Sequence, residues 1–181
     1  YAFLMKLLLA LIIVTSSAHQ SVVTQKYNRK HWKHWTDADR DCQNTRHEIL
    51  ISRSLLPVSF DRKKCVVMRG KWNDYYYPEV HTWASRVDID HLVPLKNAHE
   101  TGGAGWSKKK KKAFANDPEN LVITNLKYNR KKGSKGIDKW LPVHQDYACK
   151  YIKDWMKIKK KYSLKITEAE NMAIKASRCN F

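Results

Sequence analysis

The spacing of hydrophobic and polar residues changes several times along this chain, and each spacing predicts a different element. Between residues 87 and 91 apolar and polar residues alternate, as they do in a half-buried β-strand. The short apolar run Leu121–Ile123 predicts a second strand. The next segment, Leu126–Lys132, predicts a short helix that ends at Gly133. Together these elements form a ββα unit.

The last third of the chain is predicted to be helical. Apolar residues recur there at steps of three and four positions and form one stripe, made of Ala148, Tyr151, Ile152, Trp155, Ile158 and Tyr162. Thr167 and Glu170 have the spacing of a capping box, which predicts the start of a final helix. The stripe is interpreted as core.

Shorter patterns predict the remaining elements. A helix begins near Thr45 and turns Ile49, Leu50 and Leu55 inward. A strand is predicted at Cys65–Met68, ending at Gly70, and a hairpin or loop at Tyr75–Pro78. One or two helical turns are predicted between Lys96 and Glu100. A further helix is predicted from Lys108 to Ala115, with Ser107 as its cap.

The acidic segment before Thr45 has two interpretations. Asp37, Asp39, Asp41 and Glu48 match four ligand positions of a calcium loop, but Cys42 stands where that loop requires glycine. An acidic turn that caps the following helix is therefore favoured over a calcium site.

The chain carries a large positive charge. Its 181 residues contain 35 Lys and Arg against 17 Asp and Glu, a formal net charge of +18. Such a surface attracts phosphates through Coulomb attraction and counterion release, so nucleic acid is favoured as partner over an anionic membrane or a cell wall. The length suits one domain with its own core.

Residues 1–18 are typical of a signal peptide. Lys6 precedes the apolar run Leu7–Val14, and Ser16–Ala18 supply the small residues that a signal peptidase requires. The run is too short for a bilayer, which takes about 20 apolar residues. We therefore expect a secreted, extracellular protein, monomeric and without membrane contact after cleavage.

The next segment, residues 19–35, is polar and basic. It contains His31 and His34, which would be neighbours on a helix. A solvated arm is favoured over a metal site there. The remaining residues, 36–181, are expected to form the folded domain.

Four cysteines follow the predicted cleavage site, and an even number in a secreted protein predicts two disulfides. Three pairings are possible. The pairs Cys42–Cys65 and Cys149–Cys179 are favoured because each brackets one local segment. Each bridge would contribute about 3 kcal/mol by restricting the unfolded chain. The wide, irregular spacing differs from that of zinc ligands.

The predicted ββα unit carries polar residues that suit hydrolysis assisted by a metal ion. Asp90 offers an anionic oxygen and Asn129 a neutral one, and Mg²⁺ prefers such ligands. His91, with an ordinary pKa near 6.5, can take a proton from water. Asn120 could orient His91 or hold the turn between the strands. Lys132 shares a helix face with Asn129 and could meet a phosphate.

Strand geometry sets a condition on this site. Adjacent side chains on a strand point to opposite faces, so Asp90 and His91 converge only if the strand ends or bulges there. Pro94, three residues after His91, favours such an end.

On these residues the chain resembles the HNH, or ββα-metal, endonuclease superfamily. More closely, it resembles small secreted proteins related to the C-terminal domain of GmrSD-type restriction endonucleases. The likeness covers most of residues 36–179. Its motifs are Thr45-Arg46-x-Glu48-x-Leu50, Asp88–Leu95, Gly105–Ser107, Phe114–Pro118, Asn120-Leu121, Asn129-Arg130-x-Lys132-Gly133 and Trp140–Pro142.

The resemblance implies roles for individual residues. His91 matches the general base, and Asp90 and Asn129 match metal ligands. Asn120 matches the asparagine that holds the motif together, and Lys132 a basic position after the last ligand. The second carboxylate, Asp88, matches a group that supports the ligands, and the favoured disulfide pairs match the family pattern. Asn129 replaces the histidine of the archetypal motif, which favours Mg²⁺ or Mn²⁺ over Zn²⁺.

The fold expected from this resemblance is α+β, a single domain with a ββα-metal core, surrounding helices and two disulfides. The expected activity is hydrolysis of phosphodiester bonds in DNA, and also RNA, with low sequence specificity. A non-catalytic nucleic-acid binder and a cationic toxin are the alternatives. Residues expected to contact the nucleic-acid backbone are Lys108, Lys109, Lys110, Lys111, Lys112, Arg130 and Lys131.

Overall fold

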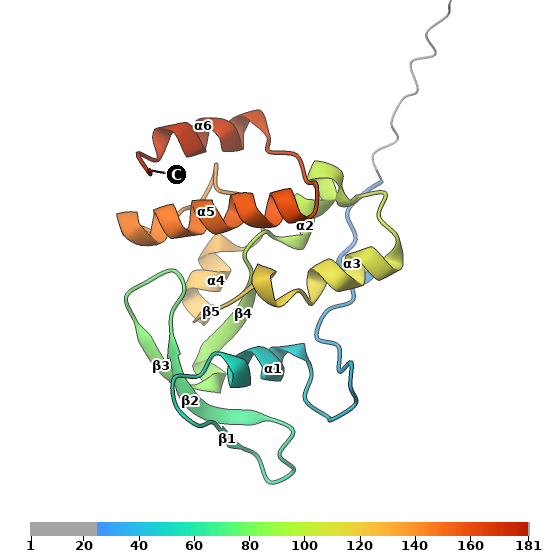
Figure 1. Cartoon of the computed structure of the whole chain (residues 1–181), viewed down its shortest axis with the longest axis vertical. Coiled ribbons are helices and arrows are strands. Elements are labelled where there is room, and N and C mark those ends of the chain that lie inside the picture. Colours follow the sequence, from blue (N-terminus) through green and yellow to red (C-terminus); the bar gives the residue numbers. More distant parts are fainter. Residues whose placement is uncertain (1–24, 181) are drawn as a thin grey trace, which may run out of the picture.

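The computed structural model describes residues 25–180 of the chain, which form one α+β domain with two small antiparallel sheets (Figure 1). The predicted signal peptide, residues 1–18, lies outside the described residues. Within residues 25–180, no helix has the length and apolar character needed to cross a membrane. The helices are α1 (Thr45–Ser52), α2 (Leu95–Ala98), α3 (Lys108–Ala115), α4 (Leu126–Lys132), α5 (Gln145–Lys161) and α6 (Glu168–Ala176).

The two sheets lie on the side of the molecule away from α6, as Figure 1 shows. One sheet has the order β1–β2–β3 and consists of β1 (Ser59–Phe60), β2 (Val67–Asn73) and β3 (Val80–Trp83). The other pairs β4 (Val87–His91) with β5 (Leu121–Asn125), and it carries the candidate site.

The predicted ββα unit is confirmed as β4, β5 and α4. In its antiparallel register Ile89 faces Ile123 and His91 faces Leu121. Asn125 ends β5 and caps α4, because its side chain accepts the Lys127 amide. Gly133 follows α4 with φ of +56°, a backbone conformation that suits glycine. The helix therefore ends at Lys132, directly before Gly133, as the sequence predicted.

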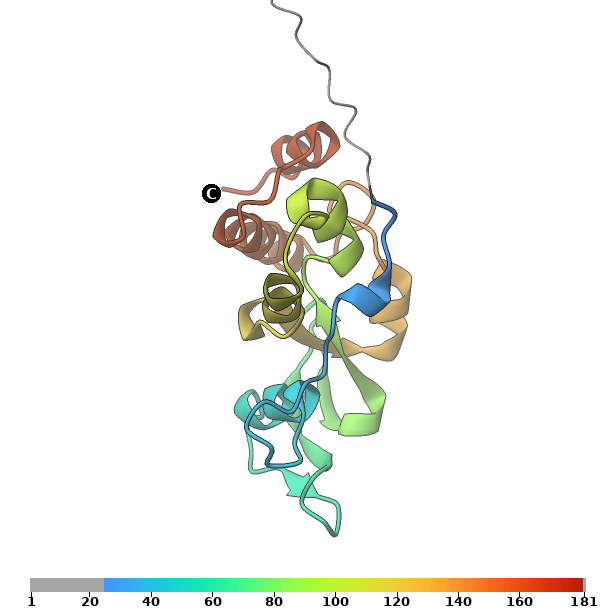
Figure 2. The ribbon, with the colours of Figure 1, turned by 90° about the vertical axis from the view of Figure 1, so that its right-hand side faces the viewer.

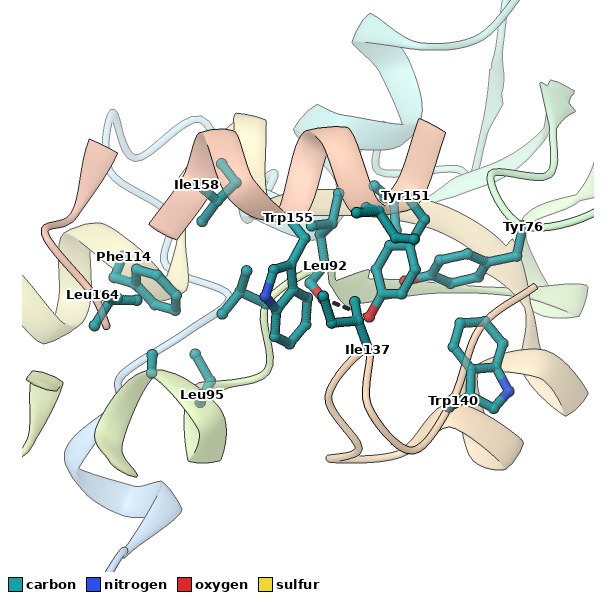
Figure 3. Close-up of a cluster of buried hydrophobic side chains, with 14 of the residues drawn as sticks. Tyr76, Leu92, Leu95, Phe114, Ile137, Trp140, Tyr151, Trp155, Ile158 and Leu164 are labelled. Carbon is teal, nitrogen blue, oxygen red and sulfur yellow. Dashed lines mark hydrogen bonds between the residues drawn. The ribbon is translucent and has the colours of Figure 1, made fainter. Parts of the chain in front are cut away.

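Two hydrophobic clusters stabilise the domain. The larger one surrounds α5, whose predicted stripe is buried from Ala148 to Ile158 and half-buried at Tyr162; Figure 3 shows Tyr151, Trp155 and Ile158 of this stripe. Its tyrosines and tryptophans pack edge to face, for example Tyr76 against Tyr151. The smaller cluster joins α1 and β2 to the β4–β5 pair and includes Leu50 and Trp72. The ββα unit thus lies between two cores, which fix its position.

The two predicted disulfides are confirmed. Cys42 bonds Cys65 and Cys149 bonds Cys179, so each bridge closes a local segment. The capping box at the start of α6 is also confirmed, with Thr167 as its N-cap. These covalent and capping contacts hold the periphery to the two cores.

Some predicted details are wrong. Leu55 is 56% exposed because α1 already ends at Ser52. The strand predicted at Cys65–Met68 runs instead from Val67 to Asn73, through Gly70. A Cβ at Gly70 would come within 2.5 Å of the Trp72 ring, so this glycine allows close packing and does not end the strand.

The N-terminal arm and the acidic turn also differ from expectation. Trp32 is fully buried, so the arm is not solvated over its whole length. The cap of α1 is Asn44, whose side chain accepts the Arg46 amide, and not an aspartate. Asp37, Asp39 and Asp41 are exposed and lie close together, and the calcium alternative stays a prediction.

Candidate functional site

Strand β4 ends in a pocket of about 270 Å³. Asp90 and His91 both line it although they are neighbours in sequence, and Asn129 of α4 lines it too. The strand terminates at His91, and Leu92–Pro94 turn away from it. Asp90 and His91 therefore converge on one pocket at the end of β4, which was the condition set by strand geometry.

The imidazole of His91 has a defined tautomer. Its Nε2 lies 2.8 Å from the carbonyl oxygen of Ala115, at the end of α3. Because a carbonyl can only accept, Nε2 carries the proton and Nδ1 keeps its lone pair. Burial lowers the pKa of His91 to about 3, against the opposing effect of this hydrogen bond. The ring is thus neutral at neutral pH, and its Nδ1 lone pair is not protonated.

Asp90 is held by two buried donors. Its Oδ2 accepts the Tyr76 hydroxyl at 2.7 Å and pairs with Lys132 Nζ, also at 2.7 Å. Lys132 Nζ in addition donates to the carbonyl oxygen of His91 at 2.9 Å. Burial raises the pKa of Asp90 and lowers that of Lys132, while their attraction opposes both shifts. Lys132 therefore fixes the end of β4 from within the protein.

Asn129 is oriented by Asp88. The Nδ2 of Asn129 donates to Asp88 Oδ2 at 2.9 Å, so the amide oxygen is the atom left for other partners. Asp90 keeps its second carboxylate oxygen, Oδ1, free of these side-chain contacts. One carboxylate oxygen and one amide oxygen on the same pocket form a donor set that fits Mg²⁺ or Mn²⁺.

Asn120 holds the turn, and its side chain makes its hydrogen bonds to Val93 and not to His91. Its Oδ1 accepts the Val93 amide at 2.8 Å, and its Nδ2 donates to the Val93 carbonyl at 3.2 Å. The backbone carbonyl of Asn120 accepts the Leu92 amide. The sequence left open whether Asn120 orients His91 or holds the turn between the strands, and these contacts correspond to holding the turn.

The cationic residues expected on the nucleic-acid backbone are placed unequally. Arg130 and Lys131 are exposed on α4, directly after Asn129. On α3 the lysines at 108, 109, 110 and 112 are exposed as well. Lys111 is buried, and its Nζ donates to the Ala104 carbonyl at 2.7 Å, so this lysine has a structural contact.

Sequence reasoning missed several groups around the pocket. Tyr76 belongs to a run of tyrosines that indicated only a loop, and the Ala115 carbonyl has no sequence signature at all. Arg29 lines the same pocket, and the rings of His34 and Trp35 lie 6.2 and 5.9 Å from that of His91. The pair His31 and His34 was the one signal in that segment.

A second group of side chains could hold a metal ion: Asp74, Glu79 and His81, whose ligand atoms lie within 4.8 Å of one another. Both Asp74 oxygens are already engaged. They accept the Tyr76 and Asn125 amides, the Thr124 hydroxyl and His81 Nε2. The group therefore fits a hydrogen-bonded link from the β2–β3 loop to β5 better than a metal centre.

The comparisons with known proteins concern the same part of the chain. The family model described as the C-terminal domain of GmrSD restriction endonucleases matches residues 41–176. An uncharacterized secreted protein of Arthroderma benhamiae is 38% identical over 150 residues, which cover 82% of this chain and 72% of that protein. No solved structure matches. The ββα unit, with Asp90, His91 and Asn129 of the pocket, lies inside the matched span.

Proposed function

Because this chain belongs to the family of GmrSD restriction endonuclease C-terminal domains, we propose that it is a secreted, metal-dependent endonuclease acting on DNA, and also on RNA. One observation carries the proposal. His91 lines the same pocket as Asp90 and Asn129, and because its Nε2 is bound to the Ala115 carbonyl, Nδ1 is the nitrogen left to accept a proton. A proton acceptor next to oxygen ligands for a metal is the arrangement that phosphodiester hydrolysis requires.

The chemistry follows from the contacts of each residue. Asp90 and Asn129 would hold Mg²⁺ or Mn²⁺, which when bound supplies positive charge for a phosphate oxygen and the leaving oxygen. Nδ1 of His91 accepts a proton from the water that attacks phosphorus, while the Ala115 carbonyl maintains the tautomer. Lys132 holds Asp90 in place. No 2′-hydroxyl takes part, so the mechanism admits DNA and RNA.

Weak sequence selectivity is expected from the surface around the pocket. Exposed cations on α3 and α4 contact phosphates, and phosphate contacts carry no sequence information. The charge of +18 supports an anionic polymer as substrate. The secreted relative and the two disulfides support an extracellular site of action.

The test is cleavage by the oxidised protein without residues 1–18. Plasmid DNA and a structured RNA are incubated with Mg²⁺, with Mn²⁺ and with EDTA. We expect cutting that needs a metal and that falls about 10²–10⁴-fold in His91→Ala. The matched control is His144→Ala, since His144 is an exposed histidine at the start of α5.

Three outcomes would contradict the proposal. A folded protein that binds DNA but cuts nothing with either metal would be a nucleic-acid-binding protein. Equal cutting by His91→Ala and the wild type would show that His91 is not the base. Equal loss in His144→Ala would show that the effect is not specific to the pocket.

A further inference from the structure

Residues 25–36, called the N-terminal strap below, run along the side of the molecule past α4 and α3 (Figure 2). The anchor of the strap is Trp32, which is fully buried. Its ring packs against Phe114 at 5.6 Å and Trp106 at 5.8 Å between centroids. Burial of a tryptophan contributes several times the thermal energy, so the strap is a fixed part of the domain.

A second anchor ties the strap to the end of α3. Asn116 Nδ2 donates to the Lys33 carbonyl at 2.8 Å, and Asn116 Oδ1 accepts the Thr36 amide at 3.1 Å. These two bonds bracket His34 and Trp35. Asn116 directly follows Ala115, whose carbonyl holds His91. The same turn of chain therefore positions both His91 and the strap.

The strap brings a cation to the pocket. Arg29 lines the pocket together with Asp90, His91 and Asn129. It forms no ion pair with any carboxylate among residues 25–180, whereas Lys132 is already paired with Asp90. Arg29 also begins a short 3-10 helix, Arg29–His31, capped by Asn28. Arg29 thus lies at the pocket without an anionic partner from the described part of the chain.

His34 contacts this arginine. His34 Nδ1 lies 3.0 Å from the Trp32 carbonyl, so Nδ1 carries the proton and Nε2 keeps its lone pair. Arg29 Nη2 lies 3.5 Å from that Nε2, at the limit of a hydrogen bond. His34 can therefore steady Arg29 while most of the guanidinium donors remain free.

We propose that Arg29 binds the phosphate undergoing cleavage and that His34 is its positioning residue. The inference rests on the proposed nuclease function and adds a residue that lies before the matched span of 41–176. The planar fork of a guanidinium donates two parallel hydrogen bonds to phosphate oxygens. Negative charge grows on those oxygens as water attacks, so Arg29 stabilises the transition state more than bound substrate.

The test compares Arg29→Ala, Arg29→Lys and the control Lys30→Ala on a short duplex with Mg²⁺ or Mn²⁺. Lys30 is the next residue of the strap, is exposed and carries the same charge. We expect Arg29→Ala to lower kcat about 10²–10³-fold with little change in KM, as loss of one transition-state donor does. Arg29→Lys should recover part of that loss, and Lys30→Ala should stay within about twofold of wild type.

Rescue by a small cation separates a chemical role from a structural one. Guanidinium chloride at about 20 mM, far below the molar concentrations that unfold proteins, should restore cutting by Arg29→Ala at least several-fold. It should not restore cutting by His91→Ala. His34→Ala should lower kcat about tenfold, but should have no further effect in Arg29→Ala if it acts through Arg29. His34→Gln, whose amide oxygen can still accept from Arg29, should retain most of the activity.

The outcomes distinguish the inference from the function on which it rests. Absence of cutting by the wild type with either metal would overturn the proposed function. Cutting by the wild type with unchanged kcat in Arg29→Ala would overturn the role of Arg29 alone. If Arg29→Ala unfolds at a lower temperature than wild type, its loss of activity alone is not sufficient evidence. Recovery in Arg29→Lys and rescue by guanidinium then support the role of Arg29, and the absence of both contradicts it. Equal losses of kcat in Arg29→Ala and Lys30→Ala would show that Arg29 contributes only general charge attraction.

Discussion

Lys132 Nζ lies 2.7 Å from Asp90 Oδ2, and both side chains are buried, with 0% and 8% of their surface exposed. A buried ion pair stabilises little in total, but removal of one partner leaves an uncompensated charge. Lys132→Met should therefore lower the free energy of unfolding by about 3–5 kcal/mol. Urea unfolding followed by tryptophan fluorescence measures this change.

The matched control is Lys131→Met on the same helix. Lys131 is exposed, so its replacement should change the free energy of unfolding by less than about 0.5 kcal/mol. Similar stabilities for both variants would show that Lys132 is solvated in solution. It would then be free to meet a phosphate, as the sequence alone had suggested.

Asn120 makes a second prediction about the framework of the site. Its amide satisfies both the N–H and the carbonyl of Val93 within the core. Asn120→Ala leaves two buried backbone groups without partners, each of which costs about 1–3 kcal/mol. We expect a decrease of about 2–6 kcal/mol in the free energy of unfolding, measured in urea. A decrease below about 1 kcal/mol would mean that water replaces the amide.

The proposed metal ligands can be separated from the Asp74, Glu79 and His81 group by titration. Asn129→Ala should raise the Mg²⁺ concentration for half-maximal cutting about tenfold or more, because a ligand is removed. Glu79→Gln should leave that concentration unchanged, since Glu79 contacts Tyr128 and lies outside the pocket. A higher Mg²⁺ requirement in Glu79→Gln, with no change in Asn129→Ala, would place the metal at Asp74, Glu79 and His81.

Much of the site was accessible from the sequence because its elements are local. Alternation predicted β4, and a helix stop at Gly133 predicted the end of α4, so Asp90, His91 and Asn129 could be expected together. The disulfides followed similarly from their local spacing. These features depend on residues close in sequence, where the rules of strand and helix geometry suffice.

Contacts between distant segments were not accessible. Trp32 lies in a basic segment without a regular apolar pattern, and nothing nearby reveals that Trp106 and Phe114 enclose it. The burial of Lys132 and of Lys111 was missed for the same reason, since a lysine is rarely enclosed unless it finds a partner. Each partner, Asp90 for Lys132 and the Ala104 carbonyl for Lys111, comes from another element.

The stability of the α5 region should depend on acidity through Asp154. Burial alone would raise the pKa of Asp154, but hydrogen bonds from Lys150 and Tyr75 outweigh it and lower the pKa. A lowered folded-state pKa contributes stability that is present above the unfolded value, near 3.9, and is lost as pH falls through the folded value. The gap in melting temperature between wild type and Asp154→Asn should therefore narrow as the pH falls below about 4.

Tyr75→Phe serves as the companion variant. It removes one of the two donors to Asp154 and keeps the carboxylate, so it should show part of the same pH dependence. A gap between wild type and Asp154→Asn that stays constant from about pH 7 to about pH 3 would show that packing, and not the charge of Asp154, stabilises this region.

Salt dependence tests which cations bind the nucleic-acid backbone. Replacement of one phosphate-binding cation by a neutral residue should lower the slope of log affinity against log salt by about one. The double variant Arg130→Ala with Lys131→Ala should therefore lower the slope by about two, measured as DNA binding in EDTA. Lys111→Met should leave the slope unchanged, because the Lys111 ammonium is buried against the Ala104 carbonyl. A flat slope in the wild type would mean that its charge does not drive binding.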